Sequence, residues 1–421
     1  MANTILNPSI IAKAAVRILD NELVMANRVY RGYEDEFGKK VNGYDIGDTI
    51  TIRKPNQFTV RSVIAASVQD VTEGKLTMVA NNIRGVDFQF TSQQLTLNIS
   101  ELAERVIKPA MVQLANAIDA AVMAEFFRVP TWMGMPAAGT PDAPVDSFVK
   151  FARGTERLDQ YACPQDDRSA VLSPESNWAL AGSQTALFLQ SVGQPAYRTG
   201  EIGTIGGVKT YMSQNVPTFT RGTATGGLVN GAGQAVTYAT VKDTESVPGT
   251  QSLITDTWTI SSTIPKGTVF TIAAVFAVNP VTKAVLPFLQ HFTVVVDAVS
   301  DGTGNATLTI APAIITSGAF QSVSAGPADN AALAIAGTVS VAYRQNMIFH
   351  KNAFALATVP LVKPAGAVDV ARESYKGLSV RLIPYYDGAN DISNWRCDVL
   401  FATKTVDPRL AVRLSGNAAT L

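Results

Sequence analysis

Cysteine and histidine are scarce in this 421-residue chain, which contains two of each. Cys163 and Cys397 form no C-x-x-C motif, so we expect two core thiols in a reducing compartment rather than a disulfide framework. His291 and His350 stand far apart with no motif around either of them. The sequence therefore predicts no metal site and no cofactor.

Charge is sparse as well. Charged residues make up 16% of the chain, and 34 basic residues balance 34 acidic ones. This balance argues against a dedicated nucleic-acid binder, which needs a strong basic excess. A neutral surface favours self-association because little long-range repulsion opposes contact. Weak, non-specific contact with DNA is compatible with a few basic residues near the N-terminus: Lys39, Lys40, Arg53, Lys54 and Arg61.

Long hydrophobic runs are also missing. The longest, residues 268–278, is stopped by Asn279-Pro280 and is too short to span a bilayer. Near the N-terminus, Lys13, Arg17 and Asp20 interrupt the apolar residues, so the hydrophobic region of a signal peptide is not formed. We therefore expect no membrane segment.

The first hundred residues divide into a helical stretch and a β-rich stretch. Residues 8–30 carry apolar side chains at helical spacing and predict a short amphipathic arm. Residues 44–98 are rich in Thr, Val, Ile and Phe on alternating faces, which predicts a long β-ribbon. Such a ribbon is marginal alone in water, so we expect it to need a partner surface. We expect both the ribbon and the N-terminal helix to lack a place within their own subunit and to find it on an adjacent copy. The strands of the ribbon are predicted at residues 48–55, 58–63, 75–83, 87–91 and 95–98.

Residues 99–127 give the strongest helical pattern in the sequence, because apolar residues recur every three or four positions. Pro109 lies inside this pattern and should kink the helix or divide it into two collinear pieces. After a Pro- and Gly-rich connector, residues 146–221 read as alternating helices and strands. This part of the chain is expected to be a mixed α/β domain.

The segment 222–344 differs in composition, with four basic and six acidic residues among its 123. It contains six Thr-, Val- and Ile-rich stretches separated by Gly, Pro, Ser and Asp, which predicts an inserted small β-barrel or sandwich. The stretches begin near Ala235, Ser252, Thr268, His291, Ala306 and Thr338. The residue pattern of 345–421 is again like that of the segments before the insertion, and strands are predicted in its last part.

Catalytic motifs were sought and not found. Glycines precede Lys209, but Val208 stands where a phosphate loop requires glycine. No nucleophile elbow, zinc-protease motif or deaminase signature occurs. The adjacent acids Asp166 and Asp167 follow Cys163-Pro164 and are interpreted as a solvated turn. We therefore predict no catalytic residues, and association rather than turnover as the mechanism.

Several local motifs point to a known family. Ala196-Tyr197-Arg198, Gly200 and Ile202 look like an A-Y-R-x-G-x-I turn, preceded by a strand with Ser173-Pro174 opening a helix. Ser213, Val216-Pro217, Thr220 and then residues 222–226 look like the entry to an inserted domain. These residues, and the order of parts, resemble the tailed-phage major capsid proteins of the HK-ninety-seven-type fold. The resemblance is greatest to the coat proteins like that of phage P-twenty-two, which carry an inserted β-barrel.

The resemblance implies an α+β fold with six consecutive parts. They are an N-terminal arm (1–43), an extended β-loop (44–98), a spine helix with the first part of the peripheral domain (99–145), the first part of the axial domain (146–221), the inserted β-barrel (222–344) and the final strands of the axial and peripheral domains (345–421). The charge-poor insertion departs from the family pattern.

The implied function is that of a major capsid protein, which self-assembles through pentamers and hexamers into an icosahedral shell around double-stranded phage DNA. A scaffolding protein and a portal are implied partners, and the virion capsid, assembled in the bacterial cytoplasm, is the implied location. We expect Ile11, Ile18, Phe58 and Val60 to pack between subunits, and Leu102, Val106 and Leu114 to pack the spine. Some family members crosslink a loop Lys; Lys75 lies in that segment, but nothing identifies its partner.

Two alternatives stay open at this stage. One is another self-assembling shell protein of the same fold, such as a nanocompartment, which would have little need of the insertion. The other is a carbohydrate-binding enzyme with an accessory β module. That enzyme would require a carboxylate pair or an aromatic platform in a cleft, and would be a monomer in solution.

Overall fold

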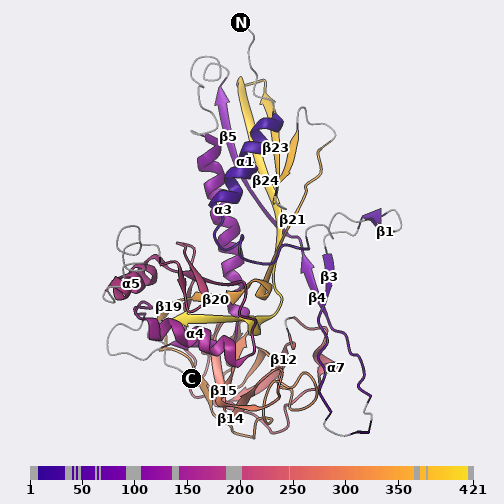
Figure 1. Cartoon of the computed structure of the whole chain (residues 1–421), viewed down its shortest axis with the longest axis vertical. Coiled ribbons are helices and arrows are strands. Elements are labelled where there is room, and N and C mark those ends of the chain that lie inside the picture. Colours follow the sequence, from indigo (N-terminus) through magenta and orange to yellow (C-terminus); the bar gives the residue numbers. More distant parts are fainter. Residues whose placement is uncertain are drawn as a thin grey trace. The chain divides into compact units, whose positions relative to one another are not determined.

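The chain divides into two units, each built from several separate segments (Figure 1). The first comprises Met1–Ile50, Thr77–Met123 and Ala355–Lys404, and the second comprises Thr51–Leu76, Ala124–Phe354 and Thr405–Leu421. This computed structural model describes residues 8–33, 40–41, 44–45, 49–61, 64–65, 68–91, 106–134, 142–185, 202–245, 247–364, 370–375 and 378–415. The A-Y-R turn at residues 196–198 lies outside the described residues.

Long antiparallel strands form the sheet of the first unit. The longest, β24 (Ile392–Thr405), pairs with both β23 (Leu378–Asp387) and β5 (Asn82–Thr91). β22 (Ala371–Tyr375) extends the sheet beyond β23, and β21 (Phe354–Val359) completes its five strands. Four of the late strands in residues 345–421, β21 to β24, therefore share one sheet with β5 of the predicted ribbon.

The N-terminal helix α1 (Pro8–Glu22) packs within the first unit against α3 (Lys108–Met123), β22 and β23. Its apolar stripe, which includes Val16 and Leu19, is buried. The buried carboxylate of Asp119 on α3 accepts hydrogen bonds from Val24 N at 2.7 Å and Ala26 N at 2.8 Å, just beyond the helix. The expectation that this helix lacks a place within its own subunit is therefore wrong, and the helix ends eight residues earlier than predicted.

The predicted spine helix is confirmed from residue 108 onward. Val106 and Ile107 form a π-helical turn, and α3 begins at Lys108, so Pro109 falls in the first turn, where its missing N–H is tolerated. The change of helical form therefore falls between Ile107 and Lys108, just before Pro109, while residues 99–105 lie outside the described part. A 3-10 turn, η3 (Ala124–Arg128), follows α3.

One helical stretch among the described residues, Lys108–Arg128, is long and apolar enough to cross a membrane by length and composition alone. One such helix is weak evidence, because the core helix of a soluble protein passes the same test. Within this stretch Leu114, Ile118 and Val122 are buried.

The predicted ribbon is shorter and more irregular than its composition indicates. β3 (Thr49–Arg53) pairs with β4 (Lys75–Val79), and each alternates buried and exposed residues as expected. A small hairpin of β1 (Lys40–Val41) and β2 (Tyr44–Asp45) precedes them. Residues 58–61 form no strand, contrary to the prediction for 58–63, and the predicted strand at 95–98 lies outside the described residues.

The second unit contains a mixed six-stranded sheet with two helices, as the alternating pattern of 146–221 predicts. Its order is β6 (Trp132–Gly134), β25 (Ala411–Ser415), β20 (Asn346–His350), β7 (Arg168–Leu172), β9 (Val208–Met212) and β8 (Thr204–Ile205). α4 (Phe148–Gln160) packs on β25 and β6, and α5 (Pro174–Thr185) contacts α4. Phe151, Leu158, Ile348 and Val412 are among its buried core residues.

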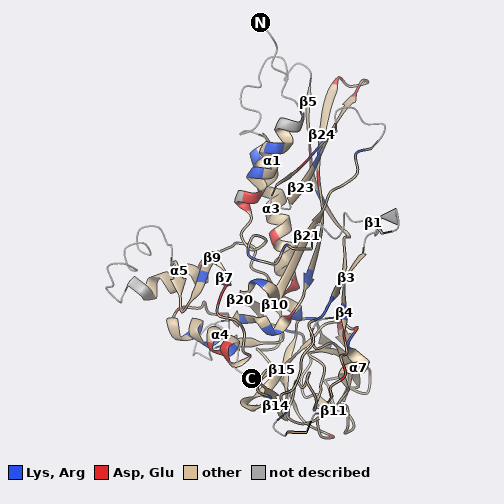
Figure 2. Ribbon diagram, turned by 45° about the vertical axis from the view of Figure 1, so that its right-hand side comes forward, with Lys and Arg blue, Asp and Glu red and all other residues tan. Residues whose placement is uncertain are grey.

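A second six-stranded sheet lies wholly within residues 222–344. Its order is β11 (Leu228–Val229), β12 (Gln251–Asp256), β17 (Ala306–Ala311), β15 (Val285–Val294), β14 (Val269–Val278) and β18 (Leu333–Ile335). Leu253, Phe270, Phe292 and Leu308 lie in its core. Few charged residues colour β11, β14 and β15 in Figure 2, in line with the composition of this segment.

Two short strand pairs accompany this sheet: β13 (Thr263–Ile264) with β16 (Ala298–Val299), and β10 (Thr218–Thr220) with β19 (Ala342–Arg344). The stretch 235–241, predicted as a strand, instead ends in a short helix, α7 (Tyr238–Val241). Tertiary contacts explain this helix, because Tyr238 and Val241 pack into an apolar cluster with Phe320.

Arg413 of β25 connects the two sheets of the second unit. Its buried guanidinium donates to Gly267 O at 2.9 Å and to Thr293 Oγ1 at 3.2 Å, both in the inserted segment, and to Val129 O at 2.8 Å. Burial lowers the pKa of Arg413 to about 9. Two further 3-10 turns, η4 (Lys351–Ala353) and η5 (Pro408–Leu410), flank this part of the chain.

Candidate assembly surface

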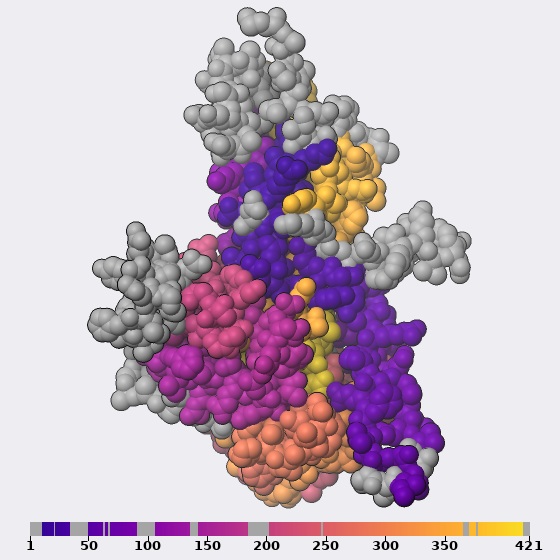
Figure 3. Space-filling view, in the orientation of Figure 1, coloured from indigo at the N-terminus to yellow at the C-terminus, as the bar shows by residue number. Residues whose placement is uncertain are grey.

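An exposed apolar loop is the most unusual feature of the described surface. We name residues 51–76, which run from the second half of β3 to the start of β4, the 51–76 loop; Figure 3 shows it in indigo at the lower right. Its exposed fractions are 58% for Phe58, 100% for Val60, 100% for Ile64, 92% for Val68 and 63% for Val71. Scattered exposed apolar residues are normal, but five within residues 58–71 mark a candidate interaction surface.

Side-chain contacts join the two limbs of the loop, the outgoing limb that contains Thr59 and the returning limb that contains Gln69. Gln69 Oε1 accepts from Thr59 N at 2.9 Å, and Gln69 Nε2 donates to Thr59 O at 2.6 Å. Arg61 also donates to Ile64 O. These contacts replace the backbone ladder that a continuous ribbon would have formed, so the loop has local order while its apolar side chains point outward.

The root of the loop is anchored on the inserted segment, within the second unit. The Lys54 side chain is 4% exposed, and its Nζ donates to Thr244 O at 2.6 Å and Lys242 O at 3.1 Å. These carbonyls lie just beyond the C-terminal end of α7. On the returning limb, Lys75 N donates to Asp243 Oδ1 at 3.2 Å. These hydrogen bonds therefore hold the base of the loop in place on the inserted segment.

A glycine permits this close approach. A Cβ built on Gly74 would lie 2.4 Å from Lys242 O and 2.7 Å from Tyr238 Oη, distances that no side chain tolerates. Gly74 O also accepts from Lys54 N at 2.8 Å, which joins the two limbs at the root. Sequence reasoning did not identify Lys54 or Gly74 as an anchor. The sequence shows only a lysine followed by a proline at the end of a predicted strand. This pattern does not specify which residues that lysine will contact.

The predicted packing residues fall into different environments. Phe58 and Val60 are exposed on the 51–76 loop. Ile11 is 4% exposed, in the core of the first unit, and Ile18 on the same helix is half-buried. Of the residues predicted to pack the spine, Leu114 is buried, Val106 is half-buried, and Leu102 lies outside the described residues.

The scarce histidines and cysteines serve local structure. His291 Nδ1 accepts from Trp132 N at 3.3 Å, and His350 Nδ1 accepts from Asn352 N at 3.2 Å. Both thiols are buried, and burial raises the pKa of Cys163 to about 11 and that of Cys397 to about 12. Among the described residues, no group of three or more His, Cys, Asp and Glu side chains could hold a metal ion.

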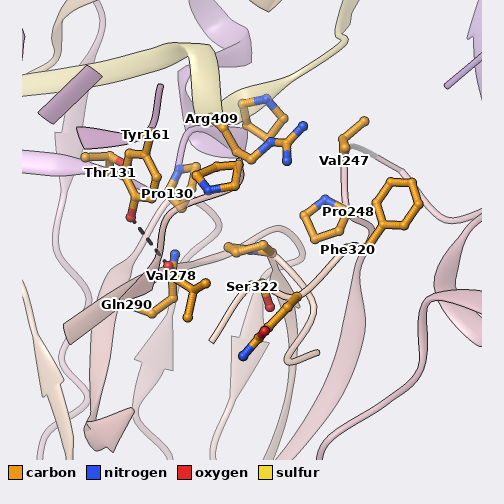
Figure 4. A pocket seen from close by; sticks show the side chains of 14 residues that line it. Pro130, Thr131, Tyr161, Val247, Pro248, Val278, Gln290, Phe320, Ser322 and Arg409 are labelled. Atoms are coloured by element: carbon orange, nitrogen blue, oxygen red, sulfur yellow. Dashed lines mark hydrogen bonds between the residues drawn. The ribbon is translucent and has the colours of Figure 1, made fainter. Parts of the chain in front are cut away.

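The second unit contains a cavity that could hold a small ligand only if its lining offers suitable groups. Its lining is rich in proline and apolar side chains, including Pro130, Pro248 and Phe320, and Tyr161 Oη donates to Gln290 Oε1 at 3.4 Å (Figure 4). Its lining residues include no Asp or Glu. The cavity therefore does not offer the carboxylate pair that a carbohydrate-active enzyme would require. Asp166 and Asp167 lie in an exposed turn, as predicted.

A neutral chain with exposed apolar side chains on an anchored loop is typical of the self-associating class of proteins. The comparison with family models identifies it further. A model described as "P22 coat protein - gene protein 5" matches residues 2–416, and the chain belongs to this family. It is a tailed-phage major capsid protein: it forms a multimeric shell and is located in the virion capsid.

Similar proteins include a phage major capsid protein and solved structures from phages. The chain is 22% identical over 386 residues, 88% of its length and 89% of the relative's, to the major capsid protein of Acyrthosiphon pisum secondary endosymbiont phage 1. A solved structure described as Mycobacterium phage Che8 is 13% identical with a TM-score of 0.47, covering 94% of this chain and 91% of that one. One described as the capsid structure of the Cyanophage P-SCSP1u is 11% identical with a TM-score of 0.43, covering 94% and 97%. The family assignment rests on the sequence match.

Proposed function

We propose that this chain is an HK-ninety-seven-type tile of an icosahedral shell that encloses double-stranded phage DNA, and that the 51–76 loop makes a principal contact between copies. The exposed apolar row of that loop is the observation that carries the proposal. Placing five such side chains in contact with a neighbour removes apolar area from water, and burying one fully contributes about 1.5 to 3 kcal/mol. Many such contacts act together when a shell closes.

The six parts predicted from the sequence are proposed to keep their capsid roles. They are the arm (1–43), the extended loop (44–98), the spine and peripheral part (99–145), the axial part (146–221), the inserted barrel (222–344) and the final strands (345–421). Closure of the inserted sheet as a barrel is supported by backbone hydrogen bonds between its edges. Leu333 N donates to Gly227 O and Val229 N donates to Ala331 O, each at 3.0 Å.

Intersubunit packing is assigned to Phe58 and Val60, whose side chains are available to a neighbour. Ile18 contributes at most its exposed edge, and the burial of Ile11 in its own unit gives it a role in holding the arm helix instead. Spine packing is assigned to Leu102, Val106 and Leu114. The burial of Leu114 supports this assignment.

The remaining partners follow from the family. We assign a scaffolding protein and a portal as assembly partners, and the packaged DNA as a non-specific contact of the inner face. Assembly takes place in the bacterial cytoplasm, without a membrane and without enzymatic turnover. The balanced charge of the chain supports weak rather than specific DNA contact.

The decisive experiment is electron microscopy and sedimentation of the purified chain, which should reveal closed shells. Val60→Asp should raise the protein concentration needed for assembly roughly tenfold or more, because it places a charge in an apolar contact. Val362→Asp, at another exposed valine outside the loop, is the matched control and should assemble like the wild type. A wild-type chain that stays monomeric with scaffolding protein present would overturn the proposal.

A further inference from the structure

The 51–76 loop and the inserted segment together form a groove of about 340 Å³ that is open to solvent. Asn56, Phe58 and Val71 line it from the loop, and Tyr238, Ala319 and Phe320 line it from the inserted segment. We propose that this groove receives an uncharged segment of a neighbouring copy of this chain. The inference rests on the proposed function and adds the inserted segment as a second wall of the contact.

The two walls are held at a fixed separation before any neighbour arrives. Lys54 anchors the root of the loop on the carbonyls after α7, as described above. Beyond the root, with its amide oriented to suit its neighbours, Gln57 donates to Ala319 O at 2.9 Å and accepts from Arg409 Nη1 at 2.9 Å. A preorganised groove favours binding, because little conformational entropy is lost when a partner enters.

The floor of the groove is apolar and aromatic. The rings of Tyr238 and Phe320 stack with centroids 3.5 Å apart and planes inclined by 8°. Phe58 and Val71 project from the opposite wall and remain exposed in the isolated chain. A segment with apolar side chains would cover both walls and remove this surface from water.

The polar groups of the groove suit a peptide rather than a phosphate. Its lining contains no Lys or Arg and one charged side chain, that of Asp70, so neither packaged DNA nor an acidic partner finds a counter-charge there. The other polar side chains of the lining, including those of Thr59, Thr72 and Ser317, are uncharged and can exchange hydrogen bonds with a peptide backbone.

The identity of the neighbour follows from continuity. The groove adjoins the exposed row at Val60, Ile64 and Val68, which faces a second copy in the proposed shell. A partner seated on that row lies beside the groove mouth, so one neighbouring chain can occupy both. The zero net charge of the chain and the low charge of its inserted segment provide uncharged segments to enter.

Charge introduced on the inserted wall tests the proposal without touching the loop. The double variant Ala239→Glu, Ser317→Glu places two carboxylates at exposed positions that line the groove. We expect the assembly concentration to rise at least tenfold while the thermal unfolding of the unassembled chain stays unchanged. The matched control, Ala325→Glu, lies at an exposed position of the same segment outside the groove and should assemble normally.

Crosslinking identifies the occupant. Ser317→Cys introduces an accessible thiol, whereas Cys163 and Cys397 are buried and provide little background. Shells are assembled from a mixture of isotopically light and heavy chains with scaffolding protein present, then treated with a reagent that joins the thiol to nearby side chains. We expect crosslinked peptide pairs in which the peptide containing position 317 comes from a light chain and its partner from a heavy chain, or the reverse.

The outcomes separate this inference from the proposed function. If the wild type forms no shells, the proposed function fails. If shells form and the double variant assembles like the wild type, the groove is not an intersubunit site. Crosslinks only within one chain, or only to scaffolding protein or DNA, would likewise overturn the assignment of a second copy as the occupant.

Discussion

The N-terminal helix and the 51–76 loop both carry apolar side chains, but in opposite environments. In α1 the apolar residues recur at helical spacing and form one stripe, which α3, β22 and β23 cover. In the loop they follow Pro55 along a segment that pairs with no described strand between residues 54 and 74, and they stay exposed. The difference shows that a segment needing a partner is recognised by the absence of a covering surface in its own chain.

The largest expected difference between the two regions is in stability. Leu19→Ala on α1 removes a fully buried side chain and should lower the free energy of unfolding by about 2 to 5 kcal/mol. Val60→Ala in the loop should change it by no more than about 0.5 kcal/mol, because the side chain is fully exposed. Urea denaturation of the unassembled chain measures both. A similar loss in the two variants would contradict the comparison.

A smaller effect is expected at the root of the loop. Lys54→Met keeps the apolar stem but removes the ammonium that bonds two carbonyls, so it should destabilise the anchored root by about 1 to 3 kcal/mol. The readout is faster proteolytic cleavage between residues 55 and 72. Lys75→Met is the matched control, since that side chain is exposed and its backbone bond to Asp243 is retained. Equal cleavage rates would refute the anchor.

The smallest expected effect depends on pH and lies at the arm helix. Burial raises the pKa of Asp119, although hydrogen bonds from Ala26 and Val24 oppose the shift. A carboxyl with a raised pKa in the folded state stabilises the fold fully below its ordinary pKa and loses that contribution as pH rises through the raised value. The stability of the wild type relative to Asp119→Asn should therefore fall as pH rises from acid to neutral. Denaturation midpoints across this range test it, and a flat or opposite trend would count against the assignment.

Much of the architecture could be predicted from the sequence because periodicity and composition report local burial. The helix from residue 108, the alternation in β3 and β4, and the inserted strands at β12, β14 and β17 follow their patterns directly. The boundaries of α1 and the helix at Tyr238–Val241 could not be predicted, since they depend on tertiary partners. Phe320 and Asp119, distant in sequence, supply those partners.

The candidate surface was predictable in part. The apolar content of residues 44–98 indicated a need for a partner, and Phe58 and Val60 are exposed. The anchor at Lys54 and the groove wall around Ala319 were not predictable, because residues separated by 188 positions meet there. A single sequence carries no signal for such a contact.

The position of β25 in the central sheet has a consequence for timing. This strand lies between β6 and β20, and its Arg413 reaches the inserted segment, yet it follows both strands and that whole segment in the sequence. The gap between β6 and β20 therefore stays open until residues 411–415 have been synthesised. A copy without these residues cannot complete its second unit, so the order of synthesis itself delays the moment at which a copy becomes competent to join others.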